Sequence, residues 1–389
     1  MNLEERAPSL ATVLREWGRI GCIGFGGPPA HIRLLRQLCV ERRKWIGATE
    51  FEDAIAACNL LPGPASTQLA IYCASRVRGR LGALVGGAAF IVPGLVVILA
   101  LAALFLETNP PQWILAAGAG AGAAVAAVAL QAGVSLVPAS WQRRRSGLRW
   151  AIYAAAGAIA AATIGAWLVL VLLACGGIEL FLEAKLTKNG AHAAGIPLLG
   201  SLPLGAPAIA LGGLAALCWV ALKVGALSYG GGFVIIPLMQ ADAVSGYHWM
   251  SDAQFLNAVA LGQVTPGPVV QTVAVIGYAV AGIPGGILAS LVAFSPSFVF
   301  ILVGAERFDR LRGNAAARAF LDGAGPAAIG AILGSAVPLA MALTQVWQFV
   351  VLAAAIVLLL IARRGVVTTL LAAAAAGVVC VLAGLPLPR

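Results

Sequence analysis

Long apolar runs without charge dominate the pattern of hydrophobic and polar positions along this chain. Four of them, at 81–106, 113–140, 151–178 and 366–387, contain no Asp, Glu, Lys or Arg. Each exceeds the roughly 20 residues that a helix needs to cross the hydrocarbon core of a bilayer. The alternation of apolar and polar residues that marks the strands of a membrane barrel is absent. The pattern therefore predicts an all-α, polytopic integral membrane protein with about 10–13 crossings.

The composition supports this class. Of the 389 residues, 61% are hydrophobic and 10% are charged, whereas about a quarter of the residues of a soluble protein are charged. The net charge of +10 fits cytoplasmic loops that follow the positive-inside rule better than it fits nucleic-acid binding. The seven cysteines are scattered without a paired motif, which predicts packing residues and no metal or other cofactor. We expect contact with a lipid bilayer and no nucleic-acid partner.

The chain repeats itself after a shift of 204 residues. Trp45 then falls on Trp249, and Pro62-Gly63-Pro64 falls on Pro266-Gly267-Pro268, with no gap between them. Tryptophan and a Pro-Gly-Pro triplet are rare, so chance is a poor explanation for both landing in register. The repeat predicts an N-terminal transporter repeat over 1–190, a linker over 191–212 and a C-terminal transporter repeat over 213–389.

The basic residues indicate how the two repeats lie in the membrane. In the first repeat, "SRVRGR" (75–80) and "WQRRRSGLR" (141–149) are basic, and "ETNPPQ" between them has no Lys or Arg. In the second repeat the order is reversed, because only the middle loop, "ERFDRLRGNAAAR" (306–318), is basic. Equivalent loops then lie on opposite sides of the membrane. The sequence predicts two inverted-topology repeats, an architecture that places the substrate near the midplane at interrupted helices.

The two Pro-Gly-Pro triplets predict breaks inside the membrane, because proline interrupts a helix and irregular backbone survives there only inside protein or beside water. The flanking charges suit broken or re-entrant helices with a triplet at each tip. A helix that restarts after each break, with Pro64 or Pro268 at its first position, presents backbone amides that bind anions. The candidate substrate-binding residues around the breaks are Asn59, Pro62, Gly63, Pro64, Ser66, Thr67, Gln68, Gln263, Thr265, Pro266, Gly267, Pro268 and Gln271.

A glycine-rich segment precedes each triplet, and it adds a second pair of helix breaks. "GFGGPPAH" (24–31) aligns with "SYGGGFVI" (228–235), and glycine allows the backbone to approach a ligand closely. Lys223 lies upstream of the second segment with no acid near it in sequence, and it aligns with Arg19. A cation in a membrane segment is a functional candidate. The candidate residues here are Arg19, Gly26, Gly27, His31, Arg33, Lys223, Tyr229, Gly230 and Gly231.

Each candidate also has a purely structural interpretation. The Pro-Gly-Pro triplets could be simple kinks, and the glycines could serve helix packing. Lys223 and Arg19 could snorkel to the interface, and Arg33 could belong to a cytoplasmic basic cluster. His31 could be a packing histidine with satisfied hydrogen bonds. Gln263 and its repeat equivalent could cap the broken helices.

The motifs resemble the chromate ion transporter family in its long, two-half form. The first half has "FGGPPAH", then "ERRKW", then "LPGPASTQLAIY", and the second half has "SYGGGF", "HW" and "LGQVTPGP". The resemblance covers nearly the whole chain. One departure is "SYGGG", where a second Phe-Gly-Gly is more usual.

The resemblance implies a secondary active transporter that exports chromate across the cytoplasmic (inner) membrane, driven by the proton gradient or the membrane potential. Sulfate shares the charge and shape of chromate, so it is a further candidate substrate. No nucleotide-binding or hydrolase motif is found, which argues against ATP hydrolysis and enzyme activity. A transporter or channel for another small anion, a lipid flippase and a passive subunit remain open alternatives. The oligomeric state is also open, with a homodimer as one option.

Overall fold

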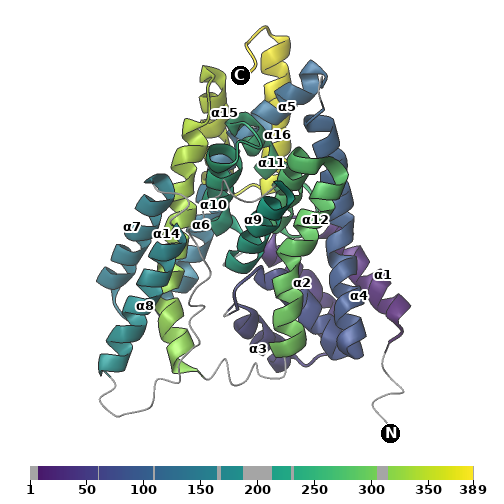
Figure 1. Ribbon diagram of the computed structural model, residues 1–389, viewed down its shortest axis with the longest axis vertical. Helices are drawn as coiled ribbons and strands as arrows, with labels where there is room; N and C mark the ends of the chain where they lie inside the picture. Colours follow the sequence, from purple (N-terminus) through teal and green to yellow (C-terminus); the bar gives the residue numbers. More distant parts are fainter. Residues whose placement is uncertain are drawn as a thin grey trace.

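The computed structural model of the protein describes residues 8–59, 61–107, 110–163, 168–186, 213–228, 232–304 and 314–388 (Figure 1). All regular elements in these ranges are helical, which confirms the predicted all-α class. We call α1 to α8 the first half and α9 to α16 the second half. The first half contains α1 (Leu10–Ile23), α2 (Pro28–Arg36), the π-helix η2 (Gln37–Arg42), α3 (Ala48–Cys58), α4 (Ala65–Phe105), α5 (Gln112–Ala123), α6 (Val125–Arg143), α7 (Gly147–Thr163) and α8 (Leu168–Leu186). The second half contains α9 (Gly213–Leu227), the 3-10 helix η6 (Phe233–Ile235), α10 (Ile236–Gln240), the π-helix η7 (Ala241–Gly246), α11 (Asp252–Val264), the 3-10 helix η8 (Val269–Gln271), α12 (Thr272–Gly304), α14 (Ala315–Met341), α15 (Val346–Ile356), the π-helix η10 (Val357–Ile361) and α16 (Val366–Leu382).

The two halves repeat their local backbone as well as their sequence. Each has a π-helical turn in the same place, η2 and η7, 204 residues apart. Lys44 and His248, which are repeat equivalents, both adopt left-handed backbone, with φ of 52° and 53°. The long helices α4 and α12 each contain a break, at Gly79 and Gly282, where φ is 62° and 60°. In the first half, α3 packs against the part of α4 that precedes its break. These two segments form a hairpin with the first Pro-Gly-Pro triplet at its tip.

The equivalent helices α4 and α12 run in opposite directions. Gly87 of α4 lies against Phe298, near the end of α12, whereas Leu99, further along α4, lies against Gly286, nearer the start of α12. In Figure 1, α4 rises toward the top of the view and α12 descends toward the bottom. This antiparallel pair confirms the inverted relationship that the basic loops predicted.

Glycines allow each half to pack into the other. α14 packs along α7 and α8, and α5 packs along α16. A side chain at Gly157 would collide with the carbonyl of Ala327, and one at Gly120 would collide with the backbone at Gly377. Small residues at such contacts bring helix backbones close together, which is how membrane helices associate. The last two helices of each half therefore lie against helices of the other half.

Four helical segments in the described residues are long and apolar enough to cross a membrane: Ala65–Phe105, Gln112–Arg143, Val269–Gly304 and Ala315–Met341. Further apolar helices are shorter, among them Gly213–Leu227 and Val366–Leu382. The apolar run 151–178 belongs to two helices, α7 and α8. The Tyr153 hydroxyl of α7 donates a hydrogen bond of 2.9 Å to Glu179 of α8, so the two helices pack side by side and do not form one continuous span. The total number of crossings stays a prediction.

Candidate functional site

The first glycine-rich segment is a sharp interruption between α1 and α2. α1 ends at Ile23, and α2 begins with Pro28 at its first turn. Gly26 and Gly27 have φ of 97° and 71°, a left-handed backbone that residues with a Cβ adopt only under strain. The helix break that the first glycine-rich segment predicts is therefore confirmed. Its counterpart in the second half includes Tyr229, Gly230 and Gly231, which lie outside the described residues.

Both Pro-Gly-Pro triplets interrupt the helices as predicted. Gly63 and Gly267 have φ of 113° and 97°. Pro64 immediately precedes α4, and Pro268 immediately precedes η8. The prolines therefore stand at the cap position, one residue before the first helical position that the sequence predicted. The first amides of the new helix have no intrahelical acceptor in either case.

The breaks of one half meet those of the other half. The Gly267 amide donates a hydrogen bond of 3.0 Å to the carbonyl of Gly24, in the first glycine-rich segment. A methyl group on Gly27 would lie 3.9 Å from Val269, the first residue of η8. Around the other triplet, a methyl group on Gly63 would lie 3.3 Å from the carbonyl oxygen of Gly225, at the end of α9. Each Pro-Gly-Pro break thus packs against the first helix, or the segment just after it, of the opposite half.

His31 joins two of these breaks. It is fully buried, its Nε2 lies 2.8 Å from the Gly24 carbonyl, and its Nδ1 lies 3.2 Å from Oγ of Ser66. Since a carbonyl only accepts, Nε2 carries the proton, and Nδ1 accepts from the Ser66 hydroxyl. Both nitrogens are engaged in this conformation, which fits the packing interpretation. A direct contact between His31 and substrate stays a prediction.

Lys223 has a carboxylate partner that the sequence did not reveal. Its Nζ lies 2.9 and 2.7 Å from the two carboxylate oxygens of Asp242, in η7. Both side chains are largely buried. Asp242 is 19 residues from Lys223 in sequence, and the fold brings η7 back against α9. Arg19 and Arg33 are exposed side chains on α1 and α2.

Buried polar atoms without a hydrogen-bond partner gather around the breaks. In the described part of the chain, six such side-chain atoms are present, in Thr67, Gln68, Ser228, Gln263, Gln271 and Ser297. Two flank the second triplet, and two follow the first. Buried polar groups are almost always satisfied in native proteins, and each exception needs an explanation. Among the described residues, these atoms are the strongest sign of a ligand site.

The two glutamines that follow the triplets are held in one orientation. Gln68 donates its amide to the Pro62 carbonyl at 2.6 Å, and Gln271 donates to the Ile91 carbonyl of α4, also at 2.6 Å. Their side-chain oxygens are the unpaired atoms. Thr265 differs, because its hydroxyl donates to the Leu261 carbonyl at 2.9 Å and is satisfied within its own helix.

Sequence reasoning missed Ser228 and Ser297. Ser228 follows α9 and is the repeat equivalent of Gly24, which has no side chain, so the repeat gives its hydroxyl no counterpart in the first half. Ser297 lies on α12 beside Pro296, and a methyl group on Gly63 would lie 3.4 Å from its Oγ. No local signal marks Ser297, since only the packing of α12 against the first triplet brings it to the site.

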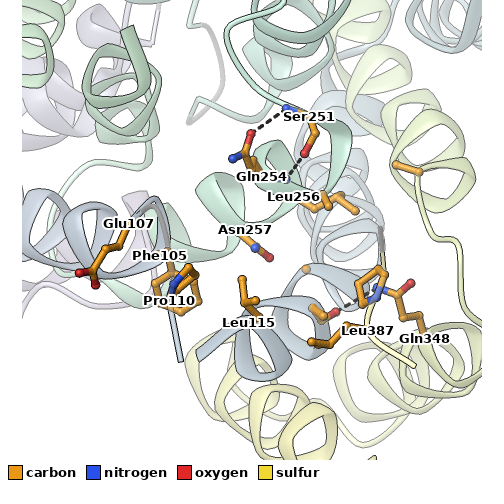
Figure 2. A pocket seen from close by; sticks show the side chains of 15 residues that line it. Phe105, Glu107, Pro110, Leu115, Ser251, Gln254, Leu256, Asn257, Gln348 and Leu387 are labelled. Atoms are coloured by element: carbon orange, nitrogen blue, oxygen red, sulfur yellow. Dashed lines mark hydrogen bonds between the residues drawn. The ribbon is translucent and has the colours of Figure 1, made fainter. Parts of the chain in front are cut away.

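A separate cavity of about 370 Å³ lies beyond the end of α4, between α5 and α11 (Figure 2). Its lining includes Gln254, Leu256 and Asn257 of α11, Gly122 of α5 and Gln348 of α15. We call it the amide cavity. None of its residues was a candidate from the sequence.

Inverted repeats whose broken helices meet around buried polar groups are the arrangement of a membrane transporter. A sequence profile described as "Chromate transporter" matches residues 11–180 and 215–378. The chain belongs to this family, and the resemblance seen in its motifs is confirmed.

Curated relatives cover most of the chain. A chromate transport protein of Cupriavidus metallidurans is 34% identical over 334 residues, which are 83% of this chain and 80% of the relative. A chromate transport protein of Pseudomonas aeruginosa is 29% identical, over 84% of this chain and 80% of the relative. The transporter YwrB of Bacillus subtilis, whose function is uncharacterized, is 42% identical over 91 residues, 23% of this chain and 45% of the relative. No solved structure matches the chain.

Proposed function

We propose that the protein is a secondary active transporter that exports chromate across the inner membrane and binds the oxyanion where the helix breaks meet. The observation that carries this proposal is the set of four unpaired, buried donor groups, in Thr67, Ser228, Gln263 and Ser297, among the six unpaired atoms at the breaks. An unsatisfied buried polar group costs about 1–3 kcal/mol. A bound ligand that satisfies several of these groups offsets that cost.

The donors among these groups suit an oxyanion. The hydroxyls of Thr67, Ser228 and Ser297 and the amide nitrogen of Gln263 can each donate a hydrogen bond. The free amides at the helix starts add positive partial charge. Chromate and sulfate both present four oxygens in a tetrahedron, so sulfate is the natural competitor for the same donors. The names of the relatives favour chromate over sulfate as the substrate.

The direction and coupling of transport rest on charge and motif. Basic side chains such as Arg76, Arg78 and Arg143 lie on one side of the inverted repeat, which the positive-inside rule assigns to the cytoplasm. They would concentrate an anion at that face before export. The chain contains no nucleotide-binding loop, so we propose that the proton gradient or the membrane potential drives export.

Uptake of labelled chromate by everted membrane vesicles tests this function, because their outer surface is the cytoplasmic face. We expect accumulation that depends on an imposed proton gradient or potential and that falls when sulfate is added. Vesicles with equal amounts of an unrelated membrane protein are the control. Correctly inserted protein that accumulates no chromate would refute the proposed substrate. Flux that follows only the chromate gradient would favour the alternative of an anion channel.

A further inference from the structure

We propose that the amide cavity is a second oxyanion subsite, at the external mouth of the transport path, from which the substrate leaves. This inference rests on the proposed function and extends it to residues outside the helix breaks. The cavity has a volume of about 370 Å³, which is ample for a tetrahedral oxyanion with some of its water.

The position of the cavity identifies its side of the membrane. Phe105, at the end of α4, lines it, whereas Arg76, Arg78 and Arg80 lie around the break at Gly79 in the same helix. The 25 residues between Arg80 and Phe105 correspond to about 37 Å of helix, more than the hydrocarbon core of a bilayer. The basic end is cytoplasmic by the positive-inside rule. The cavity therefore opens toward the external side.

One face of α11 links the cavity to the second Pro-Gly-Pro break. Leu256 lines the cavity, and Gln263, whose amide nitrogen is buried and unpaired, follows seven residues later on the same helix. Residues seven apart lie on one face, two turns or about 10 Å apart. An anion in the cavity is thus about two helical turns from the groups at the break.

The cavity offers amide donors without a fixed positive charge. Figure 2 shows the Asn257 side chain pointing into the space between α11 and α5. The oxygen of Gln254 accepts a hydrogen bond from the Ser251 amide at 2.9 Å, so its nitrogen remains for another partner. The carboxylate of Glu107 is also part of the lining. Neutral donors beside one negative charge hold an anion weakly, which suits release.

The repeat shows that the fold does not require these amides. Asn257 and Gln254 correspond to Asp53 and Glu50 in the first half. Glu50 is ion-paired with Arg76 at 2.5 Å, on the cytoplasmic side. The same two positions are thus acidic at the basic face and neutral at the external face. An anion leaving through the external face meets no carboxylate at either position.

The substitution Asn257→Asp tests this subsite by adding a negative charge of nearly the same shape. Everted vesicles are preloaded with chromate, and the luminal concentration that halves the initial uptake rate is measured. Because the lumen is the external side, we expect that concentration to rise about tenfold through charge repulsion. The KM for chromate on the cytoplasmic side should rise less, because the added charge would lie about two helical turns from the groups at the break.

A matched control is Gln112→Glu, which adds the same charge at an exposed position at the start of α5, outside the cavity lining. It should leave luminal inhibition unchanged. An active Asn257→Asp protein with wild-type luminal inhibition, or with equal shifts on both sides, would overturn the subsite. Absence of transport by the wild type would instead count against the proposed function.

A second measurement does not depend on transport. Gln254→Cys places a thiol in the cavity, and a membrane-impermeant maleimide is added to right-side-out vesicles. Sulfate, which shares the charge and shape of chromate but does not oxidise thiols, should slow the labelling of this thiol relative to the labelling of wild-type protein. Perchlorate, which accepts hydrogen bonds poorly, should slow it less. Labelling that sulfate does not change, or that occurs only in everted vesicles, would refute an external oxyanion subsite.

Discussion

The two Pro-Gly-Pro breaks have the same local backbone but different surroundings. At the first break, Asn59 and Pro62 are exposed, and Gly26 of the adjacent glycine-rich segment is exposed as well. At the second break, every residue from Thr265 to Gln271 is buried. An inverted repeat is expected to place its two halves in different conformations, so that the shared site opens to one side at a time. In this conformation the first break is the more accessible of the two.

The halves also differ in the ion pair that holds their first helix. In the first half, Glu16 of α1 pairs with Arg43, just after η2, at 2.5 Å. In the second half the charges are exchanged, because Lys223 of α9 pairs with Asp242 of η7 at 2.7 Å. Both pairs connect the first helix of a half to the segment around its π-helical turn. The connection recurs in both halves, while the sign of each charge does not.

The largest expected effect is the loss of one partner from the buried second pair. Asp242→Ala leaves the Lys223 ammonium buried without a carboxylate, which should destabilise the protein by about 3–5 kcal/mol. We expect low membrane abundance and no chromate uptake. Lys223→Ala should act in the same direction. The measurements are immunoblots of membranes and thermal unfolding of purified protein.

The charge-exchanged double variant Lys223→Asp/Asp242→Lys separates a structural tie from substrate binding. If the pair only connects α9 to η7, stability and uptake return together. Recovered stability without uptake would place Lys223 in the substrate site, as the sequence predicted. The corresponding Arg43→Ala should cost less than Asp242→Ala, because Arg43 is 40% exposed and the solvent screens its pair.

The next effect concerns the two breaks themselves. Pro266→Ala and Pro62→Ala each add a backbone N–H and relax the constraint that interrupts the helix, so both should reduce uptake. The loss should be greater for Pro266→Ala, since Gly94 of α4 packs directly on its carbonyl, whereas Pro62 is exposed. Initial rates per inserted protein measure the difference. Equal losses would contradict the asymmetry inferred from burial.

The smallest effect on stability is expected at the unpaired hydroxyls. Ser297→Ala removes a buried group that has no partner, so the melting temperature should stay the same or rise slightly. Chromate uptake should nevertheless fall about tenfold, because a bound oxyanion would lose one donor. Ser295→Ala is the control, since this exposed serine of the same helix bonds to the Val292 carbonyl. Unchanged uptake in Ser297→Ala would remove Ser297 from the site.

The sequence alone determined the class of protein, the repeat, its inversion and the breaks. These features depend on local chemistry. Long apolar runs partition into the bilayer, the charge of the loops sets their orientation, and proline and glycine interrupt helices through their own backbone properties. Tertiary structure alone decided that Asp242 partners Lys223, that His31 bonds to Gly24 and Ser66, and that Ser297 faces Gly63. It also placed the amide cavity between α5 and α11. These contacts join helices far apart in the chain, so only the packing of glycine-lined surfaces from both halves selects them.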